Sequence, residues 1–230
     1  MATALPYVDT TGRAPQVGSG GGQVQLRVRF TGVPPVPVAP DSALPDRPCR
    51  RAPVDDVVRL SRDGGVVAAL VWVDGRRLAA PRRGHRIVVA LTDCTLAPAT
   101  AVEPIGGTLD VLQRDSVRDS IVVQHVARPT ADTIVFDADG EIVPLHTRDW
   151  PAGAVTLRSL RFPWSRSIVL FAPNGTARLT SDAGTATIDS LVPGRHVLHV
   201  WHPRLGEART TITVRAGATV PATITFGAAR

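Results

Sequence analysis

The chain has 230 residues, which is enough to bury the core of one large β domain or of two smaller ones, and we expect two. Hydrophobic residues make up 43% but aromatic residues only 4%, so short branched side chains must build the interior, which favours strands. The formal net charge is +6, but the basic residues are scattered rather than gathered in a stripe with stacking aromatics, which argues against nucleic acid as a partner.

All basic residues other than His are Arg. This composition is typical of a GC-rich genome, and the alternative is that guanidinium groups pair with carboxylates or phosphates on a partner surface. No apolar run approaches the roughly 20 residues that span a bilayer, so we expect no transmembrane segment.

Residues 1–22 are predicted to form an extended arm that ends in a Gly-rich hinge. The arm has no basic segment followed by an apolar one, so no secretory signal is visible in this numbering. It is either disordered or ordered by something that binds it.

Residues 23–172 are predicted to form the first domain. The segment 23–30, QVQLRVRF, alternates apolar and polar residues as a half-buried strand does. The Pro-rich segment that follows cannot join the interior of a sheet. Short apolar runs bounded by Gly, Pro or Asp then indicate a β-sandwich rather than a βαβ unit: 57–60, 64–73, 86–91, 107–113, 120–126 and 133–137.

Cys49 and Cys94 are the only cysteines. A disulfide between them fits an exported protein, whereas two free thiols in a cytosolic protein are the alternative.

The order of these motifs resembles that of bacterial exported proteins in which a plastocyanin-like cupredoxin domain precedes a small carboxypeptidase-regulatory-like, transthyretin-like sandwich. The resemblance implies an all-β protein with a cupredoxin-like Greek key followed by that small sandwich. It extends over residues 23–226 and is carried by these features: the opening strand and Pro-rich stretch, Cys49, strand 64–73, segment 94–98, strand 107–115, the loop VTLRSLRFPWS at 155–165, and PGRHVLHVWHPRLG at 193–206.

The resemblance also identifies four positions that hold copper in the copper-binding relatives. Carried over to this sequence, the early His falls on Asp119, the Cys on Ser159, the second His on Phe162 and the Met on Ser165. Copper in such a site requires a thiolate and two imidazoles with a weak axial thioether. A Ser hydroxyl is not a soft anionic ligand, Phe has no lone pair, and a lone carboxylate favours hard cations. We therefore predict no copper, no other cofactor, and Phe162 packed into the vacated space.

Residues 173–230 are predicted to form the second domain, from five alternating pieces bounded by Gly, Pro or Asp. His196, His199 and His202 recur every three residues, but Val and Trp between them indicate a strand. His196 and His202 would then share one face, and His199 the other, so we do not expect three converging metal ligands.

An enzyme is the least supported class. Neither Ser159 nor Ser165 lies in a G-x-S-x-G turn, and no Gly-rich phosphate loop follows a strand. The acidic turn 137–140 lacks the full ligand set of a calcium loop.

By the resemblance, we expect a periplasmic, non-catalytic structural subunit that docks on a membrane electron-transport complex, such as a cytochrome-bearing complex or a photosynthetic reaction centre. Its partners would be protein subunits of that complex. Two alternatives stay open: a copper-handling or electron-transfer protein with nonstandard ligands, and a free-standing cell-surface module that binds protein or carbohydrate.

Overall fold

The computed structural model describes residues 20–35, 58–74, 86–137, 139–172 and 176–227. Strands are the regular elements of these ranges, and none of the described residues forms a helix. The predicted all-β class, with β-sandwich modules, is confirmed. Within the same ranges, no helix has the length and apolar character needed to cross a membrane.

The strands separate into two compact units, each with its own core. In unit 1 they are β3 (Arg86–Thr92), β4 (Thr95–Ala97), β5 (Thr100–Pro104), β6 (Thr108–Gln113), β7 (Asp119–His125), β8 (Asp132–Phe136), β9 (Ile142–His146), β10 (Gly153–Ser159) and β11 (Arg166–Ala172). In unit 2 they are β1 (Gly22–Thr31), β2 (Leu70–Asp74), β12 (Ala177–Leu179), β13 (Thr185–Leu191), β14 (Gly194–His202), β15 (Gly206–Val214) and β16 (Thr219–Gly227).

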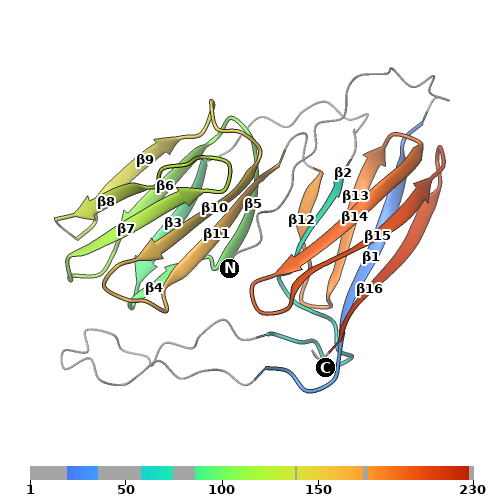
Figure 1. Cartoon of the computed structure of the whole chain (residues 1–230), viewed down its shortest axis with the longest axis horizontal. Coiled ribbons are helices and arrows are strands. Elements are labelled where there is room, and N and C mark those ends of the chain that lie inside the picture. The colour runs from blue at the N-terminus through green and yellow to red at the C-terminus, as the bar shows by residue number, and fades with distance from the viewer. Residues whose placement is uncertain (1–19, 36–57, 75–85, 138, 173–175, 228–230) are drawn as a thin grey trace. The chain divides into compact units, whose positions relative to one another are not determined.

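Unit 1 is a sandwich of two sheets, with strand orders β5-β11-β10-β7-β8 and β4-β3-β6-β9 (Figure 1). β10 is antiparallel to both β11 and β7, as is β8 to β7, β4 to β3 and β9 to β6, whereas β3 and β6 run parallel. Alternate residues of β7 and β10 point inward, because successive side chains of a strand face opposite ways. Their inward residues include Ile121, Val123, Val155 and Leu157, which contribute to one apolar core.

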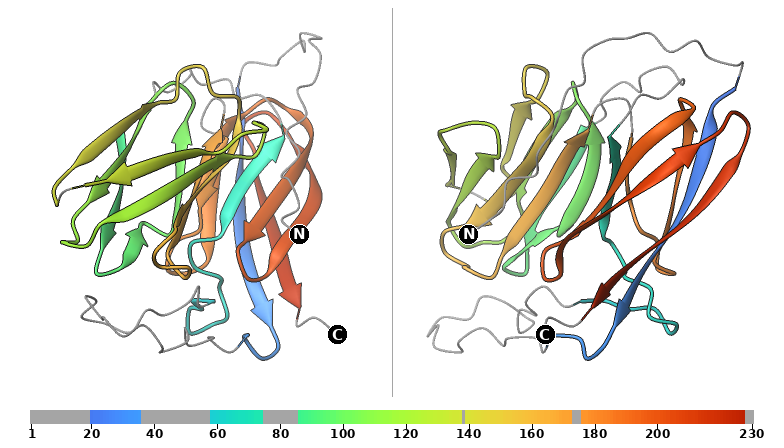
Figure 2. Two further views of the ribbon diagram at one scale, coloured as in Figure 1. Left: turned by 60° about the vertical axis from the view of Figure 1, so that its left-hand side comes forward. Right: turned by 45° about the vertical axis from the view of Figure 1, so that its right-hand side comes forward.

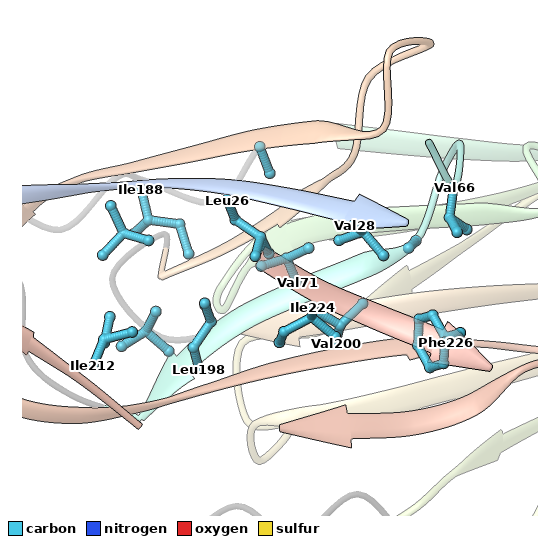
Figure 3. Close-up of a cluster of buried hydrophobic side chains, with 14 of the residues drawn as sticks. Leu26, Val28, Val66, Val71, Ile188, Leu198, Val200, Ile212, Ile224 and Phe226 are labelled. Carbon is cyan, nitrogen blue, oxygen red and sulfur yellow. The ribbon is translucent and has the colours of Figure 1, made fainter. Parts of the chain in front are cut away.

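Unit 2 has sheets of order β13-β1-β16 and β12-β2-β14-β15. β1 runs antiparallel to β13 and parallel to β16, and it lies beside the C-terminal strand in both views of Figure 2. Figure 3 shows side chains of strands from both sheets meeting in the core. They include Leu26 and Val28 of β1, Val71 of β2, and Phe226 of β16.

The structure divides the chain at other places than we expected. The segments 23–31 and 70–74, which we assigned to a first domain of residues 23–172, pair with strands of the C-terminal segment 173–230 instead. Residues 58–74 group with unit 2 as a whole, and the strands from β3 to β11 build unit 1. The alternation of β1 fits any sheet with one buried face, so it does not identify the partner strand. The proposed arm, residues 1–22, lies outside the described residues except for its last three.

Candidate functional site

The four positions assigned by resemblance to a copper site meet at one end of unit 1. Asp119 begins β7, Ser159 ends β10, and Phe162 and Ser165 lie in the short loop between β10 and β11. All four are buried, with exposed fractions of 5% for Asp119, 1% for Phe162 and 0% for both serines. The strand pairing of β7 with β10 places Ser159 opposite Ile121, next to the start of β7.

Asp119 is the centre of a buried hydrogen-bond network. The Ser159 hydroxyl donates to Asp119 Oδ2 at 2.5 Å, and the backbone N–H groups of Ser120 and Arg161 donate to Oδ1 at 2.6 and 3.1 Å. Ser159 Oγ in turn accepts from the N–H of Phe162 at 2.7 Å. Both carboxylate oxygens are therefore satisfied, as burial of a charged group requires. The network fixes the first half of the loop onto β7.

Ser165 fixes the second half of the loop. Its hydroxyl oxygen accepts from the N–H of Leu96 at 2.8 Å, and its carbonyl accepts from the N–H of Ser159 at 3.1 Å. The Trp164 indole N–H donates to the Cys94 carbonyl at 3.1 Å. The Trp164 ring also lies 5.5 Å from that of Phe162, centroid to centroid. Together these contacts hold the loop over the sandwich core.

The turn between β3 and β4 is held by a further carboxylate. Asp93 and Cys94 both have positive φ angles, 51° and 62°, as in a two-residue hairpin turn of type I′. Asp115 accepts from both of their N–H groups at 2.7 Å. Asp115 therefore holds the turn that contains Cys94, whose carbonyl accepts from Trp164.

The residues at the four positions do not fit copper. The Ser159 hydroxyl donates to Asp119 and accepts from the N–H of Phe162, while Ser165 Oγ accepts from the N–H of Leu96. Phe162 offers no donor atom and packs with the core. Within the described ranges, no three His, Cys, Asp or Glu side chains are arranged to hold a metal ion. The arrangement closes a loop, and the Ser159 hydroxyl is buried within it.

Of the two cysteines, Cys94 is buried in the core of unit 1, whereas Cys49 lies outside the described residues. The pairing of Cys49 with Cys94 stays a prediction.

His125, at the end of β7, has surroundings that sequence reasoning missed. Its Nδ1 accepts from the N–H of Ala127 at 3.0 Å, so Nε2 carries the proton and donates to the Pro151 carbonyl at 2.9 Å. The ring meets Trp150 edge-on at 5.8 Å, and the Arg128 guanidinium lies 6.0 Å from the centre of the same Trp. Burial lowers the pKa of His125 below 6.5; the bond to Pro151 opposes this shift, and the nearby charge of Arg128 adds to it.

The pKa of His125 predicts the direction of a pH effect on stability. Because the folded pKa lies below the unfolded value of 6.5, the unfolded chain binds the proton more readily. We expect the free energy of unfolding to be highest above that value and to fall as the pH drops through the folded pKa. Urea unfolding from about pH 7.5 to about pH 5 measures this slope, which His125→Gln should reduce. The matched control is His146→Gln at an exposed His of β9; an equal reduction there would contradict the assignment.

The three histidines of β14 point as the strand alternation predicts, and each has different hydrogen-bond partners. In His196, Nε2 lies 2.7 Å from the Val192 carbonyl oxygen and Nδ1 lies 3.3 Å from that of Asp74. His202 Nδ1 accepts from the N–H of Arg204 at 3.2 Å.

His199 lies between two carboxylates that the sequence does not bring together. Its Nε2 is 2.8 Å from Asp74 Oδ2 and its Nδ1 is 3.0 Å from Glu207 Oε1, while its ring stacks on Trp72 at 4.8 Å between centroids. Asp74 is 125 positions away in the sequence, and only the pairing of β2 with β14 makes them neighbours. Of these two contacts, the sequence could have suggested only the one with Glu207, because Glu207 lies on β15, which forms a hairpin with β14.

The described geometry defines an all-β protein of two sandwich units whose first unit carries a loop closed by a buried carboxylate. No protein-family model and no curated protein matches the sequence. Among solved structures, a Cu(I) form of an amicyanin mutant is similar at 17% identity, over 38% of this chain and 82% of that chain, with a TM-score of 0.33.

Two other solved structures are similar to the same degree. A purple cupredoxin from Nitrosopumilus maritimus matches at 15% identity, over 38% of this chain and 99% of that chain, with a TM-score of 0.30. A copper-containing nitrite reductase from Thermus scotoductus SA-01 matches at 16% identity, over 42% of this chain and 25% of that chain, with a TM-score of 0.33. At these scores we build no argument on the three likenesses.

Proposed function

We propose that the chain is a non-catalytic interaction protein of the periplasm, built on a cupredoxin-like sandwich that holds no copper. The proposal extends the sequence resemblance: unit 1 is the cupredoxin-like part, and the C-terminal strands of unit 2 belong to the carboxypeptidase-regulatory-like part. Its partners are protein subunits of a membrane electron-transport complex, on which it docks from the periplasmic side.

The single observation that carries it is the bond from Ser159 to Asp119, 2.5 Å long and buried. In a copper site of this kind, both positions would hold metal ligands. Here they hold each other, with the N–H groups of Arg161 and Phe162 completing the network. A side chain that is committed to a buried network is not available to a metal without breaking it. The loop is therefore maintained for its shape, which supports a binding role over a redox role.

The periplasmic location carries a further expectation for the cysteines. In that compartment, Cys49 and Cys94 would form a disulfide. Because Cys94 is buried in the folded protein, the labelling is done on the chain unfolded in denaturant. It should fail without reductant, and labelling of both residues would argue for a reducing compartment.

A copper titration separates this proposal from the alternative of a redox protein. Because the four positions supply no thiolate and no imidazole, we expect the purified full chain to show no stoichiometric copper binding at this site and no thiolate-to-copper colour. The measurement is isothermal titration with Cu(I) and Cu(II), with absorption spectra recorded in parallel. Binding at one ion per chain that Ser159→Ala or Asp119→Asn abolishes would overturn the proposal.

A further inference from the structure

Two exposed apolar side chains lie in one row on the outer face of the five-stranded sheet of unit 1. Val135 of β8 is 60% exposed and Leu160, the first residue after β10, is 51% exposed. Ser120 of β7 pairs with Val135 on one side, and its carbonyl accepts from the N–H of Leu160 at 2.9 Å on the other. Ser120 therefore lies between two apolar side chains that face solvent. β7, β8 and β10 are neighbours in Figure 1.

The next row on the same face carries positive charge. Leu157 and Ser159 point into the sandwich, so Arg158 points outward with Leu160. Arg158 pairs with Val122 of β7, which is two residues beyond Ser120. Side chains two residues apart on a strand share a face. Arg158 and Val122 therefore form a second row on the same face. We call the five residues Ser120, Val122, Val135, Arg158 and Leu160 the Val135/Leu160 face.

The rim of this face is also mainly basic. Arg161 follows Leu160, and its guanidinium lies 5.9 Å from the centre of the Phe162 ring. Arg118, with 79% of its side chain exposed, precedes β7 and is 4.0 Å from Asp137, a carboxylate at the same rim. An exposed pair of that length contributes little. Arg158 and Arg161 form no ion pair within the part of the chain that the structure describes.

We propose that the Val135/Leu160 face docks a protein partner that presents carboxylates around a shallow apolar hollow. The inference rests on the proposed function as an interaction subunit and names the surface and the chemistry of its partner. Arg is enriched in protein interfaces, where its planar guanidinium pairs with carboxylates, and apolar side chains at the centre supply the burial. Opposite charges across such an interface accelerate association and select the partner.

Charge also argues against the other occupants of this face. In a symmetric contact between two copies, the same patch meets itself, so Arg158 and Arg161 of one copy would approach those of the other. Insertion into a lipid surface uses a broad apolar face with large side chains, whereas here two separate aliphatic side chains are exposed. An acidic protein surface is the occupant that both rows of the face fit.

The test is co-sedimentation of the labelled full chain with membranes from a strain of the source organism that lacks the gene. We expect saturable binding that protease treatment of the membranes removes. Leu160→Asp and Arg158→Glu should each weaken it by about tenfold or more, because they introduce acidic groups at the contact. The matched control is Ile142→Asp, an exposed position of β9 in the other sheet, which should bind like the wild type.

The outcomes separate this surface from the proposed function. If the wild type does not bind membranes, the proposed function is overturned and the surface with it. If the wild type binds and both face variants bind equally well, only the surface is overturned. Equal binding to protein-free vesicles of phosphatidylcholine and phosphatidylglycerol would replace the protein partner with lipid. Dimers in sedimentation velocity that Leu160→Asp dissociates would replace it with a second copy. All variants change exposed residues, so their unfolding midpoints should match that of the wild type.

Discussion

Combining Asp119→His, Ser159→Cys, Phe162→His and Ser165→Met is expected to give a protein that binds one copper ion and turns blue. The reason is that the four positions already meet at one end of unit 1, between β7, β10 and the loop that joins β10 to β11. The substitutions supply a thiolate, two imidazoles and a weak axial thioether, the ligand set of a blue copper site. Absorption spectra and electron paramagnetic resonance during a Cu(II) titration measure the result.

The control for this experiment retains Ser159 and carries the other three substitutions. Without the thiolate it should lack the intense thiolate-to-copper absorption at any copper concentration. The variant with all four changes loses the Asp119 network, so its apo form should unfold at a lower temperature than the wild type, and copper should raise that temperature by binding the folded state. A folded variant that binds no copper would show that the four positions do not converge closely enough for a metal.

Replacing Asp119 by Ala is expected to cost roughly 3 kcal/mol or more of the free energy of unfolding. The change removes the acceptor of three hydrogen bonds and leaves the buried Ser159 hydroxyl and two partly buried N–H groups without that partner. Asp119→Asn keeps an acceptor oxygen and should cost less. Denaturant unfolding at neutral pH measures both values.

The matched control is Asp132→Ala on the neighbouring strand β8. Asp132 pairs with Arg128 at 3.3 Å, but its side chain is 55% exposed. An exposed ion pair contributes at most about 1 kcal/mol, so the loss should be small. If Asp119→Ala costs no more than Asp132→Ala, the buried network does not hold the loop, and the proposed reason for its retention fails.

Local alternation predicted much of unit 1 and part of the site. The pattern of β7 and β10 is carried by neighbouring residues, so reading it along the chain gives the buried face of each strand. The resemblance then placed Asp119, Ser159, Phe162 and Ser165 together, and Phe162 packs in the core of unit 1. What the sequence did not reveal is how Asp119 would be used, because the bond to Ser159 spans 40 positions.

The domain boundary failed for a different physical reason. The alternation of Gln23 to Phe30 is the same whether β1 joins one sandwich or the other, and its parallel partner β16 lies at the far end of the chain. The contact of His199 with Asp74 depends on the same kind of long-range pairing. Periodicity specifies which face of a strand is buried, but the partner is chosen by the packing of whole sheets.

The pairing of β1 with β13 and β16 has a consequence for the order in which the protein is made. β1 is the first of the described strands to leave the ribosome, yet both of its neighbours in the sheet come from the last part of the chain. The strands β3 to β11 are contiguous and can assemble while synthesis continues. Unit 2 must wait for residues 219–227, so its first strand remains an open edge until that segment has been made.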